Sequence, residues 1–239
     1  MARINNPVIG FIEEDVWRLH HPHDDALKAP SITVLVVPFY AEPVHHWDAR
    51  TGRLTDFTTQ FSFIIKTIDD EPPLYGDGHA FLIATFESNI PSNSSGRYLG
   101  LFSSEDVFNT SRNQTVAVEF DSYKNSWDPY ANHVGINVNS IESVLFTDLI
   151  WESSIEYGSR VYASVDYNST TKSLSVTVTN TNFVSFISYV IDLSHVLPEW
   201  VRVGFSATTG RLSYIKFVLG HSLQHLETED RKRKNKVGL

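Results

Sequence analysis

Short runs in which apolar and polar residues alternate recur along most of this chain. Residues 116–121 and 133–138 alternate on either side of a polar turn, and residues 161–167 and 174–178 do so around the turn at 168–172. Such a period of two is typical of strands that turn one face to the core. No long segment has the 3.6-residue period of a helix. The pattern predicts an antiparallel β-sandwich.

Other segments differ from this simple alternation. Residues 80–86 are almost continuously apolar, which indicates a strand buried on both faces. The last strand is expected at residues 215–219. We expect three parts, which are an N-terminal segment (1–37, with one strand near 32–37), a single domain (38–222) and a charged C-terminal tail (223–239).

Composition narrows the range of functions. Nineteen basic and 28 acidic residues give a net charge of −9, which argues against nucleic acid as a partner. Cysteine is absent, so disulfides and thiol chemistry are excluded. The longest apolar run, residues 32–37, is too short to cross a bilayer, and we expect no membrane insertion. We also expect no secretory signal, because the apolar residues 8–12 run directly into three acidic residues.

Potential metal ligands gather between residues 119 and 133. Glu119 and Asp121 lie two apart on one strand and therefore share a face, and Asn125, Asp128 and His133 follow around the turn. Carboxylate, amide and carbonyl oxygens suit calcium, and carboxylates with one imidazole suit a transition metal such as manganese. A polar strand face followed by an Asp-Pro turn is the alternative.

Residues 116–141 resemble the signature of the legume (L-type) lectins. Residues 42–63 are similar to a second passage of that family, and residues 204–210 to its GFSAATG loop. Residues 94–102 resemble its GGYLGLF loop, with Arg97 where a second glycine is usual. The resemblance implies a concanavalin A-like jelly-roll sandwich. Its N-terminal edge is expected to be incomplete, since the usual aromatic-rich first strand is missing. YAEPV and Leu219-Gly220 also resemble the receptor-kinase ectodomain branch, although no kinase motif is present.

The resemblance also implies two metal ions. Manganese would be held by four side chains, namely Glu119, Asp121, Asp128 and His133. Calcium would be held by the side chains of Asp121, Asn125 and Asp128 and by the carbonyl of Tyr123.

A sugar site beside these ions is implied as well. Asp77 would accept hydrogen bonds from sugar hydroxyls, Asn125 would donate one, and the ring of Tyr123 would face the sugar. The backbone N–H groups of Arg97, Arg211 and Leu212 would donate the others. The loop at 211–217 has the short form of mannose- and glucose-binding members, which predicts that class of sugar.

The implied function is therefore a non-catalytic lectin, with glycans or glycoproteins as partners, in the extracellular space or the vacuole. Association of identical chains stays open. Four N-x-S/T sequons, at Asn93, Asn109, Asn113 and Asn168, fit a glycoprotein.

Two alternatives stay open beside this function. One is a degenerate lectin, suggested by the divergent N-terminus and by His221 where a core tryptophan is expected. The other is a jelly-roll glycoside hydrolase, which needs a second carboxylate close to Glu119. Tyr123 and Lys124 stand where that acid would be.

Overall fold

A computed structural model describes residues 8–12, 16–18, 34–36, 43–67, 77–129, 132–148, 159–209 and 213–226. These residues form β-strands and two short 3-10 helices, η1 (Gly96–Tyr98) and η2 (Leu193–His195). Within these ranges, no helix is long and apolar enough to cross a membrane. Every strand pairing is antiparallel, which confirms the predicted all-β antiparallel fold.

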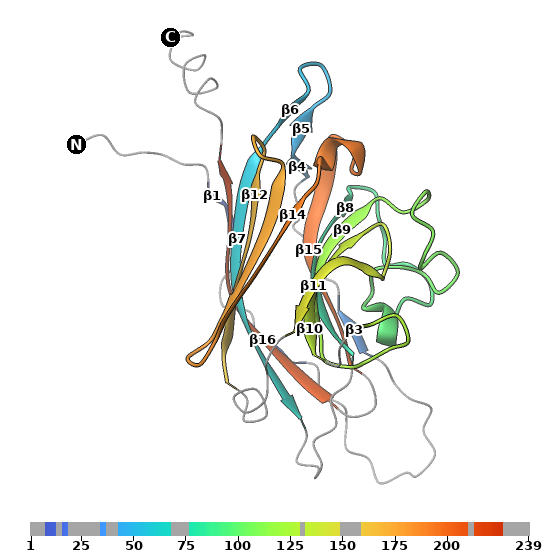
Figure 1. Cartoon of the computed structure of the whole chain (residues 1–239), viewed down its shortest axis with the longest axis vertical. Coiled ribbons are helices and arrows are strands. Elements are labelled where there is room, and N and C mark those ends of the chain that lie inside the picture. Colours follow the sequence, from blue (N-terminus) through green and yellow to red (C-terminus); the bar gives the residue numbers. More distant parts are fainter. Residues whose placement is uncertain are drawn as a thin grey trace, which may run out of the picture.

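Two seven-stranded sheets form the two layers of the molecule (Figure 1). The first sheet has, in spatial order, β1 (Val8–Ile12), β16 (Ser213–Leu226), β7 (Asp56–Thr67), β12 (Val161–Asn168), β13 (Ser173–Thr179) and β14 (Val184–Val190), and β2 (Val16–Arg18) also pairs with β16. The second sheet has β11 (Ser143–Asp148), β10 (His133–Val138), β9 (Thr115–Asp121), β8 (Gly78–Thr85), β15 (Trp200–Thr209) and β3 (Val34–Val36), and β4 (Val44–His45) also pairs with β15. A separate small ribbon pairs β5 (Trp47–Asp48) with β6 (Arg53–Leu54).

The main core lies between the two sheets and is rich in phenylalanine. Phe61 on β7 meets Phe205 on β15 edge to face at 4.9 Å, and Phe63 meets Phe120 on β9 at 5.1 Å. Because strand side chains alternate, one face of each strand supplies these rings. Edge-to-face ring pairs add to the stabilisation that burial already provides.

A second apolar cluster covers the opposite face of the second sheet. Ala80, Leu82 and Ala117 face away from the main core and pack against loop residues that include Leu99 and Phe102. Strands β8 and β9 are therefore buried on both faces, as the continuous apolar run of β8 predicts. In Figure 1 these loops, drawn in green, lie beyond the second sheet, on the side away from the first. The 3-10 helix η1 lies within these loops.

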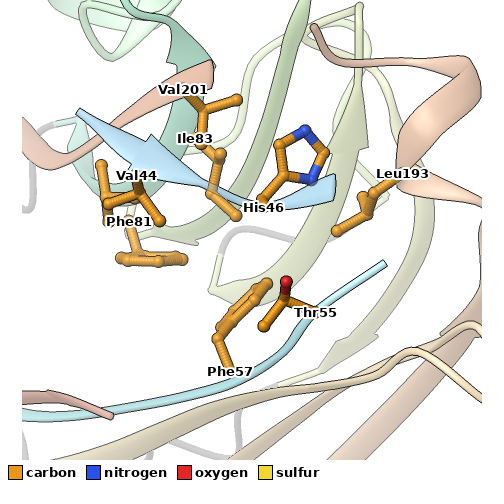
Figure 2. Close-up of a pocket in the computed structure, with 9 residues that line it drawn as sticks. Val44, His46, Thr55, Phe57, Phe81, Ile83, Leu193 and Val201 are labelled. Atoms are coloured by element: carbon orange, nitrogen blue, oxygen red, sulfur yellow. The ribbon is translucent and has the colours of Figure 1, made fainter. Parts of the chain in front are cut away.

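A small cavity lies in the main core, between β4, β7, β8 and β15. Figure 2 shows its lining, which is mostly apolar and includes Phe57, Phe81 and Ile83, with His46 and Thr55 as the polar members. Its volume is about 20 Å³, close to the space that one water molecule needs. This cavity is too small to hold a sugar, and we interpret it as a gap in the packing of the core.

The structure adds strands at both chain ends. The N-terminal edge, expected to be incomplete, is formed by β1 and β2, which pair with β16. The strand expected near residues 32–37 is β3, which pairs with β15. The sequence of β1 is a short apolar run without alternation, so its pattern gave no strand signal. The last strand is also longer than the predicted 215–219, since β16 runs to Leu226 and thus through the first residues of the expected tail.

His221 lies in β16 opposite Ile12, and its side chain falls outside the described part of the structure. The division of the chain at residues 37 and 222 stays a prediction.

Candidate functional site

The register of β9 and β10 places three potential metal ligands on one face. His133 pairs with Asp121, and Gly135 pairs with Glu119. Because residues two apart on a strand share a face, Glu119, Asp121 and His133 all point to the outer side of the second sheet. Gly135 leaves the room that they need. A Cβ there would lie 2.6 Å from Glu119 Oε1 and closer still to Ser143 Oγ.

These three side chains form a tight and buried cluster. One potential ligand atom from each lies within 4.8 Å of the others, and their exposed fractions are 1%, 2% and 0%. His133 Nε2 lies 3.1 Å from Glu119 Oε1, and the hydroxyl of Ser143 on β11 donates to the same oxygen. Burial, together with the charges of Glu119 and Asp128, raises the pKa of Asp121 well above its usual range. A bound cation would compensate this concentration of negative charge.

The turn after β9 folds back on the cluster through backbone hydrogen bonds. The N–H of Tyr123 donates to Asp121 Oδ1 at 2.7 Å, and the N–H of Asn125 donates to Asp128 Oδ2 at 2.6 Å. Burial raises the pKa of Asp128. A cavity of about 110 Å³ opens beside Glu119, Asp128 and His133. The turn thus gathers carboxylate, amide and carbonyl oxygens, the donor set that calcium prefers.

Asp77 lies directly before β8 and is joined to the same turn. Both the N–H and the hydroxyl of Ser122 donate to the Asp77 carbonyl, at 2.9 and 2.6 Å. The side chain is 7% exposed, and its Oδ2 has no hydrogen-bond partner in the described structure. Burial raises the pKa of Asp77 to about 6. A buried acceptor without a donor is costly, so the geometry favours a ligand that brings one.

Two backbone features keep Asp77 close to the metal ligands. Asp77 has a φ of 43°, in the left-handed region that aspartate tolerates better than most residues. Gly78 pairs with Asp121, and a Cβ at Gly78 would collide with the carbonyl oxygen of Phe120. A larger residue at position 78 would therefore push β8 and Asp77 away from β9.

The third part of the site is η1, which carries Arg97. The Thr208 hydroxyl donates to the Gly96 carbonyl at 2.8 Å, and Thr208 pairs with Gly78. This chain of contacts places η1 beside Asp77. The Tyr98 ring stacks on Trp127, which directly precedes Asp128, with a centroid distance of 6.0 Å.

The structure thus brings together eight of the ten predicted site residues. Arg211 and Leu212 lie outside the described residues, between β15, which ends at Thr209, and β16, which begins at Ser213. Four positions that the sequence reasoning did not single out also belong here, namely Ser122, Trp127, Gly135 and Ser143. The sequence gives no local signal for Ser143, because it reaches Glu119 from a third strand, 24 residues away.

The fold is a two-sheet β-sandwich, and one of its sheets carries buried carboxylates and a histidine that could hold a metal ion near Asp77. Comparisons with known proteins identify the family. The family profile "Legume lectin domain" matches residues 31–238. Lectin 7 of Medicago truncatula is 49% identical over 189 residues, which are 74% of this chain and 70% of that protein. The chain spans 58 to 62% of the length of three other curated lectins that it matches.

Solved structures agree with this result. Lectin UEA-II complexed with galactose has a TM-score of 0.73 and 34% identity, and the match covers 84% of this chain and 85% of that one. Lectin I from Ulex europaeus, in complex with the methyl glycoside of α-L-fucose, has a TM-score of 0.75 and 29% identity, with 92% and 90% covered. The chain belongs to the legume lectin family.

Membership of this family confirms several predictions. The fold is the jelly-roll sandwich of these lectins. The protein is a non-enzymatic, carbohydrate-binding type, so the glycoside hydrolase alternative is excluded. The receptor-kinase branch stays a prediction.

Proposed function

We propose that this protein binds glycans at the junction of Asp77, the turn at residues 121–128 and η1, with calcium and manganese supporting the site. One observation carries the proposal. The buried, unpaired Oδ2 of Asp77 lies in a loop that Ser122 ties directly to the cluster of metal ligands. A neutral polyhydroxyl ligand needs a fixed acceptor of this kind, and bound ions would hold the surrounding turn in place.

The donor sets fit the two ions that are typical of the family. Manganese would be held by Glu119, Asp121, Asp128 and His133, a set of carboxylates with one imidazole. Calcium would be held by oxygens alone, from Asp121, Asn125, Asp128 and the Tyr123 carbonyl. Together the ions would neutralise the buried carboxylates and fix the side chain of Asn125 toward the sugar.

The sugar would meet a fixed acceptor, several donors and an apolar platform. Asp77 would accept from two hydroxyls, and the Asn125 amide and the N–H of Arg97 would donate. The Tyr123 ring, 51% exposed, is accessible to the C–H face of a sugar. Arg211 and Leu212 would add backbone donors from the β15–β16 connection.

Mannose or glucose is the sugar class that we propose, because the segment 211–217 has the short form of the mannose- and glucose-binding members that the sequence resembles. Residues 213–217 of this segment belong to β16, and β15 ends at Thr209. Galactose is a second candidate, since UEA-II is a similar lectin complexed with galactose. Competition on a glycan-coated surface distinguishes them. Methyl mannoside should displace the protein, and displacement by galactose alone would overturn the first assignment.

The proposed partners are the glycans of glycoproteins. The proposed location is the extracellular space or the vacuole. A glycan array with metal-loaded protein tests the proposal as a whole. Binding to a defined set of glycans is expected. No binding to any glycan by folded protein that is loaded with both ions would instead favour the degenerate lectin.

A further inference from the structure

Arg97 is held in a fixed position at the edge of the site. Its guanidinium lies 5.0 Å from the centroid of the Tyr98 ring and 5.5 Å from that of Trp127. Its Nη2 also donates to the Tyr98 hydroxyl at 2.9 Å. A planar guanidinium stacks well on aromatic faces, and these three contacts limit the number of rotamers open to an otherwise exposed side chain.

Arg97 has no carboxylate partner within the described structure. None of the ion pairs among the described residues includes Arg97, and the Tyr98 hydroxyl is a neutral acceptor. Other guanidinium N–H groups therefore stay available on an exposed side chain. An oriented guanidinium with free donors is the group that binds carboxylates and sulfates in a bidentate manner.

The position of Arg97 connects this charge to the proposed sugar site. Gly96, its neighbour, is bonded to Thr208, which pairs with Gly78 next to Asp77. On the other side, Trp127 under the guanidinium precedes Asp128. A ligand bound between Asp77 and the turn at 121–128 therefore lies next to Arg97.

We infer that Arg97 makes this site selective for acidic glycans, by pairing with a carboxylate or a sulfate ester that the bound glycan carries. The inference rests on the proposed sugar site. The net charge of −9 does not favour an anionic ligand, so an acidic glycan needs a local cation of this kind. A neutral glycan gains nothing from the charge.

A structural role is the competing explanation. In that case Arg97 only holds Tyr98 and Trp127 together, and its removal weakens every glycan to the same extent. The ratio of affinities for an acidic glycan and its neutral counterpart separates the two roles, because only a direct charge contact changes this ratio.

The test uses glycans in matched pairs, titrated against protein that is loaded with calcium and manganese. One pair compares a glucose-terminated glycan with its glucuronic acid form. Mannose- and galactose-terminated pairs differ by a single sulfate ester. For one partly exposed charged hydrogen-bonded pair, we expect about tenfold tighter binding of an acidic member. A preference confined to the glucuronic acid pair identifies a carboxylate, and one confined to the sulfated pairs identifies a sulfate.

Two variants and a control complete the design. Arg97→Gln should bring the ratio close to one. Arg97→Lys should keep part of the preference, since it keeps the charge but loses the planar stack. Arg50→Gln is the matched control, because Arg50 is exposed in the turn between β5 and β6, at the top of Figure 1 and away from η1, and it should leave the ratio unchanged. Melting curves of each variant show whether it is folded.

Salt provides a measurement on the unmodified protein. The preference for the acidic member should shrink as the salt concentration rises, because a partly exposed ion pair is screened. Equal affinities within every pair, or a preference that Arg97→Gln leaves unchanged, would overturn the inference while the sugar site stands. Failure to bind any member of any pair would contradict the sugar site itself.

Discussion

Asp77 combines a strained backbone, a buried side chain and an unpaired acceptor. Its φ is 43°, it is 7% exposed, and its Oδ2 has no partner in the described structure. The Oδ2 atom opposes folding, because a buried acceptor without a donor has lost its hydrogen bonds to water. A ligand that donates to Oδ2 would remove this cost. A substitution at Asp77 can therefore change ligand binding without destabilising the fold.

Replacing Asp77 by asparagine should therefore abolish glycan binding and leave the fold intact. The amide has nearly the same size but exchanges an acceptor for a donor, and we expect at least a hundredfold loss of affinity. The melting temperature should stay the same or rise slightly, because a buried charge is removed. Asp166→Asn, on β12 of the first sheet, is the control and should bind normally. Unchanged affinity in Asp77→Asn would show that the sugar binds elsewhere.

A substitution at Gly135 tests whether the proposed metal ligands need the space beside this residue. Gly135→Ala would place a Cβ against Glu119 Oε1 and Ser143 Oγ, so the ligands must move. We expect a loss of about 1–3 kcal/mol in the free energy of unfolding and a metal affinity about ten- to a hundredfold lower, measured by isothermal titration calorimetry. Gly52→Ala is the comparison, since Gly52 has no atom within 4 Å of the added carbon and only its positive φ is strained. If Gly135→Ala keeps its full metal affinity, the added Cβ does not displace Glu119, and the proposed role of Gly135 is wrong.

At the level of elements, the antiparallel register of β9 and β10 brings the potential metal ligands together. Much of this was predictable from the sequence, because Glu119, Asp121, Asp128 and His133 lie within one hairpin whose alternation fixes the shared face. The contribution of Ser143 was not predictable, since it depends on pairing with a third strand. Strands β1 and β2 also escaped prediction, because short apolar runs lack a period and gain their structure only by pairing with β16.

A second element, η2, allows a test that is independent of the binding site. Asp192 caps η2 by accepting from the N–H of Ser194, and its Oδ2 lies 2.5 Å from Lys172 Nζ. Burial tends to raise the pKa of Asp192, but the hydrogen bonds from Lys172 and Ser194 outweigh it and lower the pKa to about 2. A lowered pKa means that the ionised form stabilises the folded state above the ordinary pKa of 3.8.

This stabilisation should be lost as the pH falls from about 4 through 2. We predict that Asp192→Asn is less stable than the wild type at pH 6 and that most of the difference is lost by pH 2, where Asp192 becomes protonated in the folded protein. Asp192→Ala should lose about 1 kcal/mol more at pH 6, since it also removes the cap. Urea denaturation in chelator at each pH measures this without interference from the metal ligands. A difference as large at pH 2 as at pH 6 would contradict the role of the charge.

For the whole molecule, the two sheets and the loops that cover the second sheet form a scaffold for a site at its edge. The two apolar clusters of the described core contain none of the predicted metal ligands. The ligands themselves form a buried group of like charges. If these side chains hold ions, as we propose, metal binding is linked to folding through this cluster.

Removing the ions should lower the melting temperature without unfolding the protein at room temperature. An ion that binds only the folded state at about 100 times its Kd adds about 2.7 kcal/mol. For a domain of this size, that corresponds to a shift of about 5–10 °C. Differential scanning calorimetry before and after EDTA measures this shift, and calcium with manganese should restore it. Identical melting curves would mean that the cluster holds no metal.

The link between metal and sugar is the central claim, and an ion cycle on one sample tests it most directly. Binding to a glycan-coated surface is measured with both ions, after EDTA, and after return of calcium alone, manganese alone and both together, with the metal content determined by elemental analysis at each step. We predict that binding disappears with the ions and returns fully when both are restored. Undiminished binding by protein that is free of metal would contradict the account.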